Sequence, residues 1–130
     1  MNEINKFPEL MDIDLDTAVK NLQKAVNYGD YLAEQKKSVA ESIYDKKVLY
    51  RKQRRVALSN KDICSGKDAK ARAEQADEYA SDELINFEKG EIEGNYLADL
   101  FKNNHDRIEA LRTIISSKKQ NLDNYNRTQM

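Results

Sequence analysis

The sequence predicts an all-α fold: a long helical hairpin with a C-terminal coiled-coil-like helix that drives oligomerisation. Apolar residues recur every three or four positions over long stretches, only one proline is present, and residues with high helix propensity are abundant. Only 39% of residues are hydrophobic, 35% are charged and the mean hydropathy is −0.89, so a thick spherical core would be hard to fill. We therefore expect one elongated helical domain over residues 1–130.

The first helix is predicted to begin soon after Pro8. Asp12, Asp14 and Asp16 follow this proline, and carboxylates can accept the unpaired N–H groups of a helix N-terminus. From there an apolar rhythm of three or four residues continues to about Leu58. Residues 1–11 precede the helix as an arm that is either flexible or docked.

Residues 59–66 are predicted to form a turn, because Asn, Asp, Ser and Gly replace the helical pattern. Ser65 and Asp68 then resemble a capping box that opens a second helix with a stripe of small residues. Gly90 and Gly94 could bend or interrupt that helix.

After Gly94 the apolar spacing becomes strictly four and three, which is typical of a coiled-coil seam. We expect this seam to join copies of the chain. Asn104 lies on it, and either pairs with its copy to fix register or faces solvent. The predicted oligomerisation residues are Leu97, Phe101, Asn104, Ile108, Leu111, Ile115 and Leu122.

The charges are distributed unevenly although the net charge is only −1. Residues 46–72 contain ten Lys or Arg and two acids, whereas residues 74–93 contain eight acids and one Lys. At 100° per residue, several of these cations share one helix face, which suits contacts to phosphates. Tyr44 or Tyr50 could stack on an unpaired base. The candidate DNA-binding residues are Lys47, Arg51, Arg54, Arg55, Lys61 and Lys67.

Two other interpretations of these charges stay open. In a hairpin the basic run could lie beside the acidic block, so that the two simply neutralise each other. Alternatively, an acidic stripe could imitate nucleic-acid phosphates and bind a basic groove on another protein. That stripe consists of Glu74, Asp77, Glu78, Asp82 and Glu83.

No pattern in the sequence points to catalysis. His105 is the only histidine and Cys64 the only cysteine, so neither a metal site nor a disulfide within the chain is predicted. There is no phosphate-binding loop, and no apolar run reaches the roughly 18 residues needed to cross a bilayer. We expect a soluble protein of a reducing compartment that is not an enzyme, needs no cofactor and does not enter a membrane.

The segment Gln53–Asp62 (QRRVALSNKD), followed by Ser65-Gly66-Lys67, resembles the UvsY recombination mediators of tailed phages. Those proteins have a similar basic pair, then Val-Ala-Leu, two basic residues spaced by one, an Asp, and Ser-Gly followed by a basic residue. Their DNA-contacting basic pair falls here on Ser59 and Lys61, so its first charge is missing. Other cations of the segment retain the basic character.

The resemblance implies an oligomeric helical accessory protein in the cytoplasm of an infected bacterial host cell. Its partners would be single-stranded DNA, a RecA-like recombinase, a single-strand-binding protein and further copies of itself. It would help load the recombinase in place of the single-strand-binding protein. The alternative is a phage-encoded coiled-coil inhibitor or scaffold that acts on a host protein through its acidic helix face.

Overall fold

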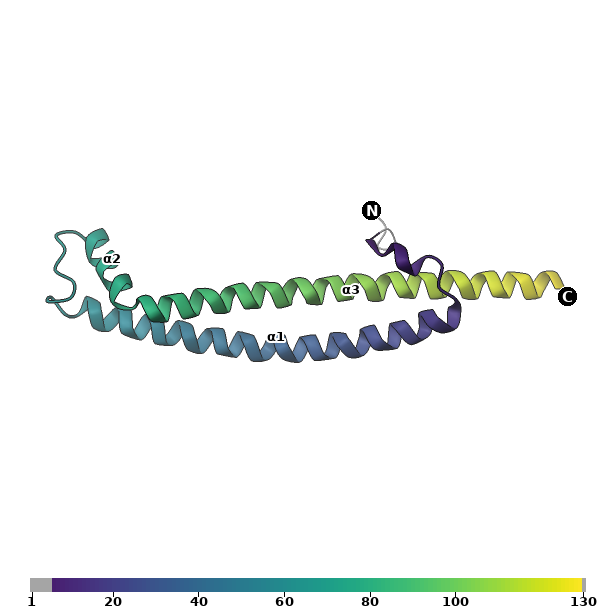
Figure 1. Cartoon of the computed structure of the whole chain (residues 1–130), viewed down its shortest axis with the longest axis horizontal. Coiled ribbons are helices and arrows are strands. Elements are labelled where there is room, and N and C mark those ends of the chain that lie inside the picture. The colour runs from purple at the N-terminus through teal and green to yellow at the C-terminus, as the bar shows by residue number, and fades with distance from the viewer. Residues whose placement is uncertain (1–5, 130) are drawn as a thin grey trace. The chain divides into compact units, whose positions relative to one another are not determined.

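The computed structural model describes residues 6–129, and every regular element in this range is helical (Figure 1). A short 3-10 helix, η2, spans Pro8–Leu10, and three α-helices follow. The all-α prediction is confirmed. The bounds of α1, α2 and α3 are Leu15–Leu58, Ala69–Tyr79 and Ser81–Gln129.

The chain divides into two compact units, and both long helices contribute to each. The terminal unit contains the chain up to Glu34 and from Ala98 onward. The central unit is Gln35–Leu97. A single domain over residues 1–130 stays a prediction.

Helix α1 begins and ends close to the predicted positions. The Asp14 carboxylate accepts a hydrogen bond from the N–H of Thr17 at 2.7 Å, which satisfies a donor of the first turn. This bond to the backbone holds the pKa of Asp14 below its ordinary value. At the other end, the Ser59 hydroxyl donates to the Val56 carbonyl at 2.9 Å, and the helical pattern stops.

The predicted reversal between residues 59 and 66 is confirmed, but the cap of the next helix differs from the prediction. Asp68 itself occupies the N-cap of α2, and its carboxylate accepts the Ala71 N–H at 2.7 Å. The capping box that was expected to start at Ser65 is therefore wrong. A carboxylate at the N-cap can satisfy a backbone N–H without a reciprocal Glu or Gln three residues later, and here that position is Ala71.

The break between α2 and α3 falls at Ala80, not at the glycines. Ala80 leaves the helical conformation with φ −96° and ψ 26°, and α3 then continues without interruption through Gly90 and Gly94. Both glycines face Ile43 of α1, where a Cβ would lie 3.3 Å from Ile43 Cγ1 at position 90 and 2.9 Å from Ile43 Cδ1 at position 94. The two glycines allow α1 and α3 to approach closely in the central unit. Their role is in helix packing, where the sequence had suggested a bend or an interruption.

The core of the terminal unit forms where the N-terminal arm packs on α1 and α3. Lys6 pairs with Asp106 at 3.0 Å, and Arg107 pairs with Glu9 at 2.8 Å. Residues 6–10 are thus docked, whereas residues 1–5 of the predicted arm, Ile4 among them, lie outside the described residues. The buried side chains here are Phe7, Leu10, Ala18, Ala25, Ala110, Leu111, Ile114 and Ile115.

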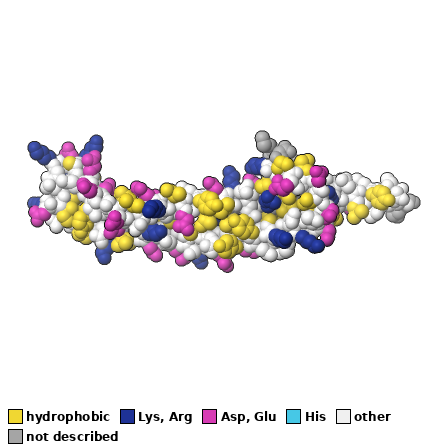
Figure 2. Space-filling model, in the orientation of Figure 1, with side chains coloured by type: hydrophobic (Ala, Val, Ile, Leu, Met, Phe, Trp, Pro, Cys, Tyr) yellow, Lys and Arg dark blue, Asp and Glu magenta, His cyan; other side chains and the backbone are white. Residues whose placement is uncertain are grey.

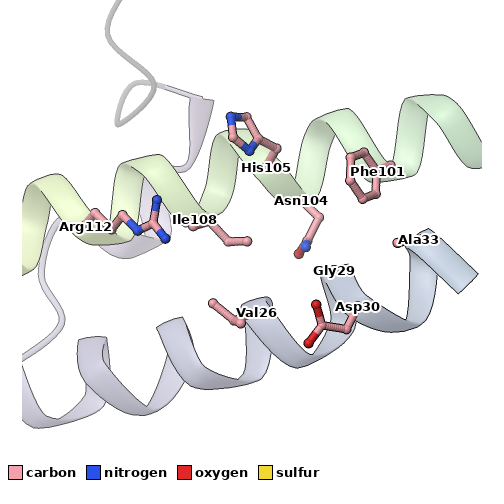
Figure 3. A pocket seen from close by; sticks show the side chains of 9 residues that line it. All are labelled: Val26, Gly29, Asp30, Ala33, Phe101, Asn104, His105, Ile108 and Arg112. Carbon is pink, nitrogen blue, oxygen red and sulfur yellow. The ribbon is translucent and has the colours of Figure 1, made fainter.

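Asn104 is buried in this unit, and its amide points from α3 toward α1 beside Gly29 (Figure 3). Its Nδ2 donates to the carbonyl oxygen of Ala25 at 2.9 Å. Of the two alternatives considered for this residue, the solvent-facing one is wrong, since Asn104 is buried. Pairing with its copy in an oligomer stays a prediction. The amide links α1 to α3 within one chain.

The central unit has a second, smaller core under the loop. Ala57, Cys64 and Ala76 are buried there, and Ile63 packs against them. Small side chains allow α1, the loop and α2 to approach closely. The thiol of Cys64 is consequently covered.

Candidate nucleic-acid interface

The predicted DNA-binding residues of α1 form what we call the α1 cationic face: Lys47, Arg51, Arg54 and Arg55. Arg51 and Arg55 are exposed, whereas Lys47 and Arg54 are half-buried. The three arginines line a shallow groove together with the apolar side chain of Val48. A groove of this composition can contact a phosphate and the apolar edge of a sugar at the same time.

Arg54 differs from its neighbours because it forms an ion pair within the central unit. Its Nε lies 3.0 Å from Asp77 Oδ1 of α2, and these side chains are 34% and 40% exposed. The Tyr50 hydroxyl donates to the same carboxylate oxygen. Burial, followed by this contact with Asp77, raises the pKa of Tyr50 above its ordinary value of 10.0.

The proposed mutual neutralisation of the basic and acidic blocks therefore occurs at one point. Within residues 6–129, Arg54–Asp77 is the one ion pair between residues 46–72 and residues 74–93. Lys47, Arg51 and Arg55 form no ion pair in this part of the chain. On the face seen in Figure 2, Lys and Arg are interspersed with Asp and Glu.

The two tyrosines proposed for base stacking differ in accessibility. Tyr44 is 66% exposed, so its ring is open to a ligand. Tyr50 is half-buried and its ring is stacked on Phe87, with a centroid separation of 6.4 Å. With its hydroxyl on Asp77 as well, Tyr50 is held as part of the packing of the central unit.

Lys61 and Lys67 lie on the loop between α1 and α2, and both are exposed. The loop is held by Gly66, whose N–H donates to the Gln75 side chain at 2.8 Å and whose carbonyl accepts from Arg72 at 3.1 Å. A Cβ at position 66 would lie 2.7 Å from the Cβ of Ala71. Close packing against Ala71 thus explains why the Ser-Gly-Lys motif has a glycine at position 66.

Sequence reasoning missed two residues that shape this region. Asp77 was grouped with the acidic stripe, but it binds Arg54 and Tyr50. Arg72 was counted only as a charge, but it donates to the loop backbone. Its position one turn into a helix that follows a tight loop is the signal that could have identified it.

The acidic stripe does not follow one uninterrupted helix. Glu74, Asp77 and Glu78 belong to α2, while Asp82 and Glu83 begin α3 beyond the break. Glu74, Glu78 and Asp82 are exposed.

The predicted oligomerisation seam lies largely inside the chain. Asn104, Leu111 and Ile115 are buried, and Ile108 packs against the same core. Leu97 and Phe101 are half-buried, whereas Leu122 is 50% exposed. Assembly of several copies therefore stays a prediction, and Leu122 is the seam residue left most open for it.

Two further properties bear on the chemistry of the described region. Within residues 6–129, no three His, Cys, Asp or Glu side chains lie together as a metal site. None of the helices described is long and apolar enough to cross a bilayer.

Comparisons with known protein families, with curated proteins and with solved structures found no match for this chain.

Proposed function

We propose that this protein binds single-stranded DNA without sequence specificity and helps a RecA-like recombinase replace a single-strand-binding protein. One observation carries the proposal. Five of the six candidate contacts have no ion-pair partner within residues 6–129, and two of them line a groove together with the apolar side chain of Val48. These five are Lys47, Arg51, Arg55, Lys61 and Lys67.

Binding by such a surface is electrostatic and depends on several weak contacts. Each phosphate neutralised releases condensed counterions, so log K falls with log salt by about 0.7 per contact on a single strand. One chain offers few contacts, and several copies on one strand would add their binding energies. A strand held by its phosphates keeps its bases accessible to an incoming recombinase. This step uses binding energy and requires no bond chemistry.

Fluorescence anisotropy with labelled oligo-dT at about 50 and about 200 mM salt tests the proposal. The wild-type protein should bind, with affinity that falls steeply as salt rises. The double variant Arg51→Glu/Arg55→Glu should bind on the order of tenfold more weakly at low salt, with a salt slope reduced by about 1.4. These positions are preferable to Arg54, because neither forms an ion pair within residues 6–129.

Lys119→Glu/Arg127→Glu is the matched control. It makes the same change of net charge at two exposed positions near the C-terminal end of α3. Its affinity should stay near that of the wild type. Equal losses in the two variants would show that only net charge matters, which contradicts a defined interface on α1.

The alternative, an inhibitor or scaffold that acts through the acidic side chains of α2 and α3, predicts no oligo-dT binding even at low salt. Asp77, one of these acidic residues, already forms an ion pair with Arg54, so it does not present a free carboxylate to a partner protein. The anisotropy experiment therefore decides between the two functions.

A further inference from the structure

The terminal unit contains a second depression, formed by α1 and α3, whose lining suits an anionic ligand with a flat ring. We call it the tyrosine pocket. Its lining includes Asn21, Lys24 and Tyr28 of α1 and Asn103 and Arg107 of α3. Leu100 contributes apolar surface. The lining thus combines two cations, an aromatic ring and three amides, the third being Asn104, whose Nδ2 is already bonded to the Ala25 carbonyl.

None of the described residues that line the tyrosine pocket is Asp or Glu. A neighbouring depression of the same unit has Asp30 of α1 in its lining, along with His105 and Arg112 of α3 (Figure 3). A carboxylate there opposes the approach of a phosphate, so the tyrosine pocket is the better site for one.

The two cations of the pocket are held differently. Lys24 is exposed and forms no ion pair within residues 6–129. Arg107 is fixed by Glu9 at 2.8 Å and lies 4.9 Å from the centroid of the Phe7 ring. Lys24 is therefore the group free to meet a phosphate, while Arg107 forms a rigid part of the wall.

An aromatic surface adjoins these polar groups. The rings of Tyr28 and Tyr31 are stacked, with centroids 6.2 Å apart and an angle of 19° between their planes. They are 44% and 55% exposed, so part of each ring remains open to solvent. A solvent-exposed pair of parallel rings beside a lysine is the arrangement on which unpaired bases stack, while the cation contacts the backbone.

We propose that the tyrosine pocket binds one nucleotide of a single strand. Its base stacks on the Tyr28–Tyr31 pair, its phosphate meets Lys24, and the amides of Asn21 and Asn103 bond to the base edge. The identity of the strand rests on the proposed DNA binding. The site itself is separate, because it belongs to the terminal unit whereas the α1 cationic face belongs to the central unit.

Photocrosslinking tests the position of the base. An oligo-dT in which 5-iodouracil replaces some thymines is bound, irradiated and digested, and the crosslinked peptides are identified by mass spectrometry. Crosslinks to Tyr28 or Tyr31 are expected, because the halogenated base reacts preferentially with a ring on which it stacks. Crosslinks found only at Tyr44 or in the loop that carries Lys61 would overturn the tyrosine pocket and leave the proposed function standing.

Affinity measurements supply an independent readout. Tyr28→Leu/Tyr31→Leu should weaken oligo-dT binding by about tenfold and leave the salt slope unchanged, because stacking releases no counterions. Tyr79→Leu/Tyr125→Leu removes two other exposed rings and should bind as the wild type does. Unchanged affinity in the Tyr28/Tyr31 variant, with helix content retained by circular dichroism, would overturn this inference alone. Failure of the wild-type protein to bind oligo-dT would overturn the proposed function and this site together.

Discussion

Gly29 and Asn104 face each other between α1 and α3 of the terminal unit, and each determines what the other position can hold. A Cβ built on Gly29 would lie 3.1 Å from Nδ2 of Asn104. That nitrogen is occupied by its hydrogen bond to the Ala25 carbonyl. The absence of a side chain at position 29 therefore makes room for the buried amide, which fixes how the two helices are aligned.

This relationship predicts that the effect of Gly29→Ala depends on Asn104. In the wild-type background the added methyl group crowds the amide, so the usual helix-propensity gain should be cancelled or reversed. In an Asn104→Ala background the same change should stabilise the protein by about 1 kcal/mol. Urea denaturation of the four proteins measures the coupling. Equal effects of Gly29→Ala in both backgrounds would contradict the close contact.

Gly66→Ala is expected to destabilise the protein by about 1–3 kcal/mol, because the new Cβ would overlap that of Ala71. The new Cβ would also lie 3.1 Å from the backbone carbonyl carbon of Ala71, which cannot rotate away. Ala71→Gly should recover part of the loss by removing one of the clashing atoms. Ser65→Ala, at an exposed neighbouring position, is the control and should change the thermal midpoint little.

Helix ends that are marked by turn-forming residues could be predicted from the sequence. Features that depend on contacts with residues far along the chain could not. The end of α1 was predictable because Ser59 and Asn60 follow a periodic run. The break at Ala80 was not, since the surrounding residues favour helix and no Gly or Pro marks it. Gly90 and Gly94 were assigned a local role because their true neighbour, Ile43, is more than a third of the chain away.

The same distinction applies to the candidate site. The clustering of cations on one face of α1 follows from helical spacing alone. The capture of Arg54 by Asp77 requires knowing how α2 packs on α1. Likewise, the docking of Phe7 and Leu10 depends on α3 residues about 100 positions away, which no local pattern reveals.

Release of Arg54 from Asp77 should strengthen DNA binding. Asp77→Asn removes the charge but keeps an oxygen that can accept from the Tyr50 hydroxyl, so the packing of the central unit is preserved. Oligo-dT affinity should rise on the order of threefold to tenfold at low salt, and the salt slope should steepen by about 0.7. Glu78→Gln makes the same charge change at an exposed position of α2. If both variants gain equally, the release of Arg54 is not the cause.

The ion pair between Lys6 and Asp106 predicts that acid loosens the N-terminal arm. The hydrogen bond from Lys6, with smaller effects of Lys102 and His105, holds the pKa of the Asp106 carboxyl below its ordinary value of 3.8. Because folding lowers this pKa, the stabilisation is complete above pH 3.8 and is lost as the pH falls through the lowered value. The protection factor of the Leu10 amide, whose N–H donates to the Phe7 carbonyl at 2.9 Å, should fall over that range. The protection factor is the measure to use, because the intrinsic rate of amide exchange itself changes with pH.

The cause of this pH dependence can be isolated by following the Asp106 carboxyl carbon by NMR. Lys6→Ala should move its pKa upward, toward the ordinary value, and should speed exchange at Leu10 already at neutral pH. Glu9→Gln breaks the other contact of the arm, the pair with Arg107, and should leave the Asp106 titration in place. An Asp106 pKa that stays equally low in Lys6→Ala would show that Lys102 and His105 set it, so that acid acts on α3 and not on the docking of the arm.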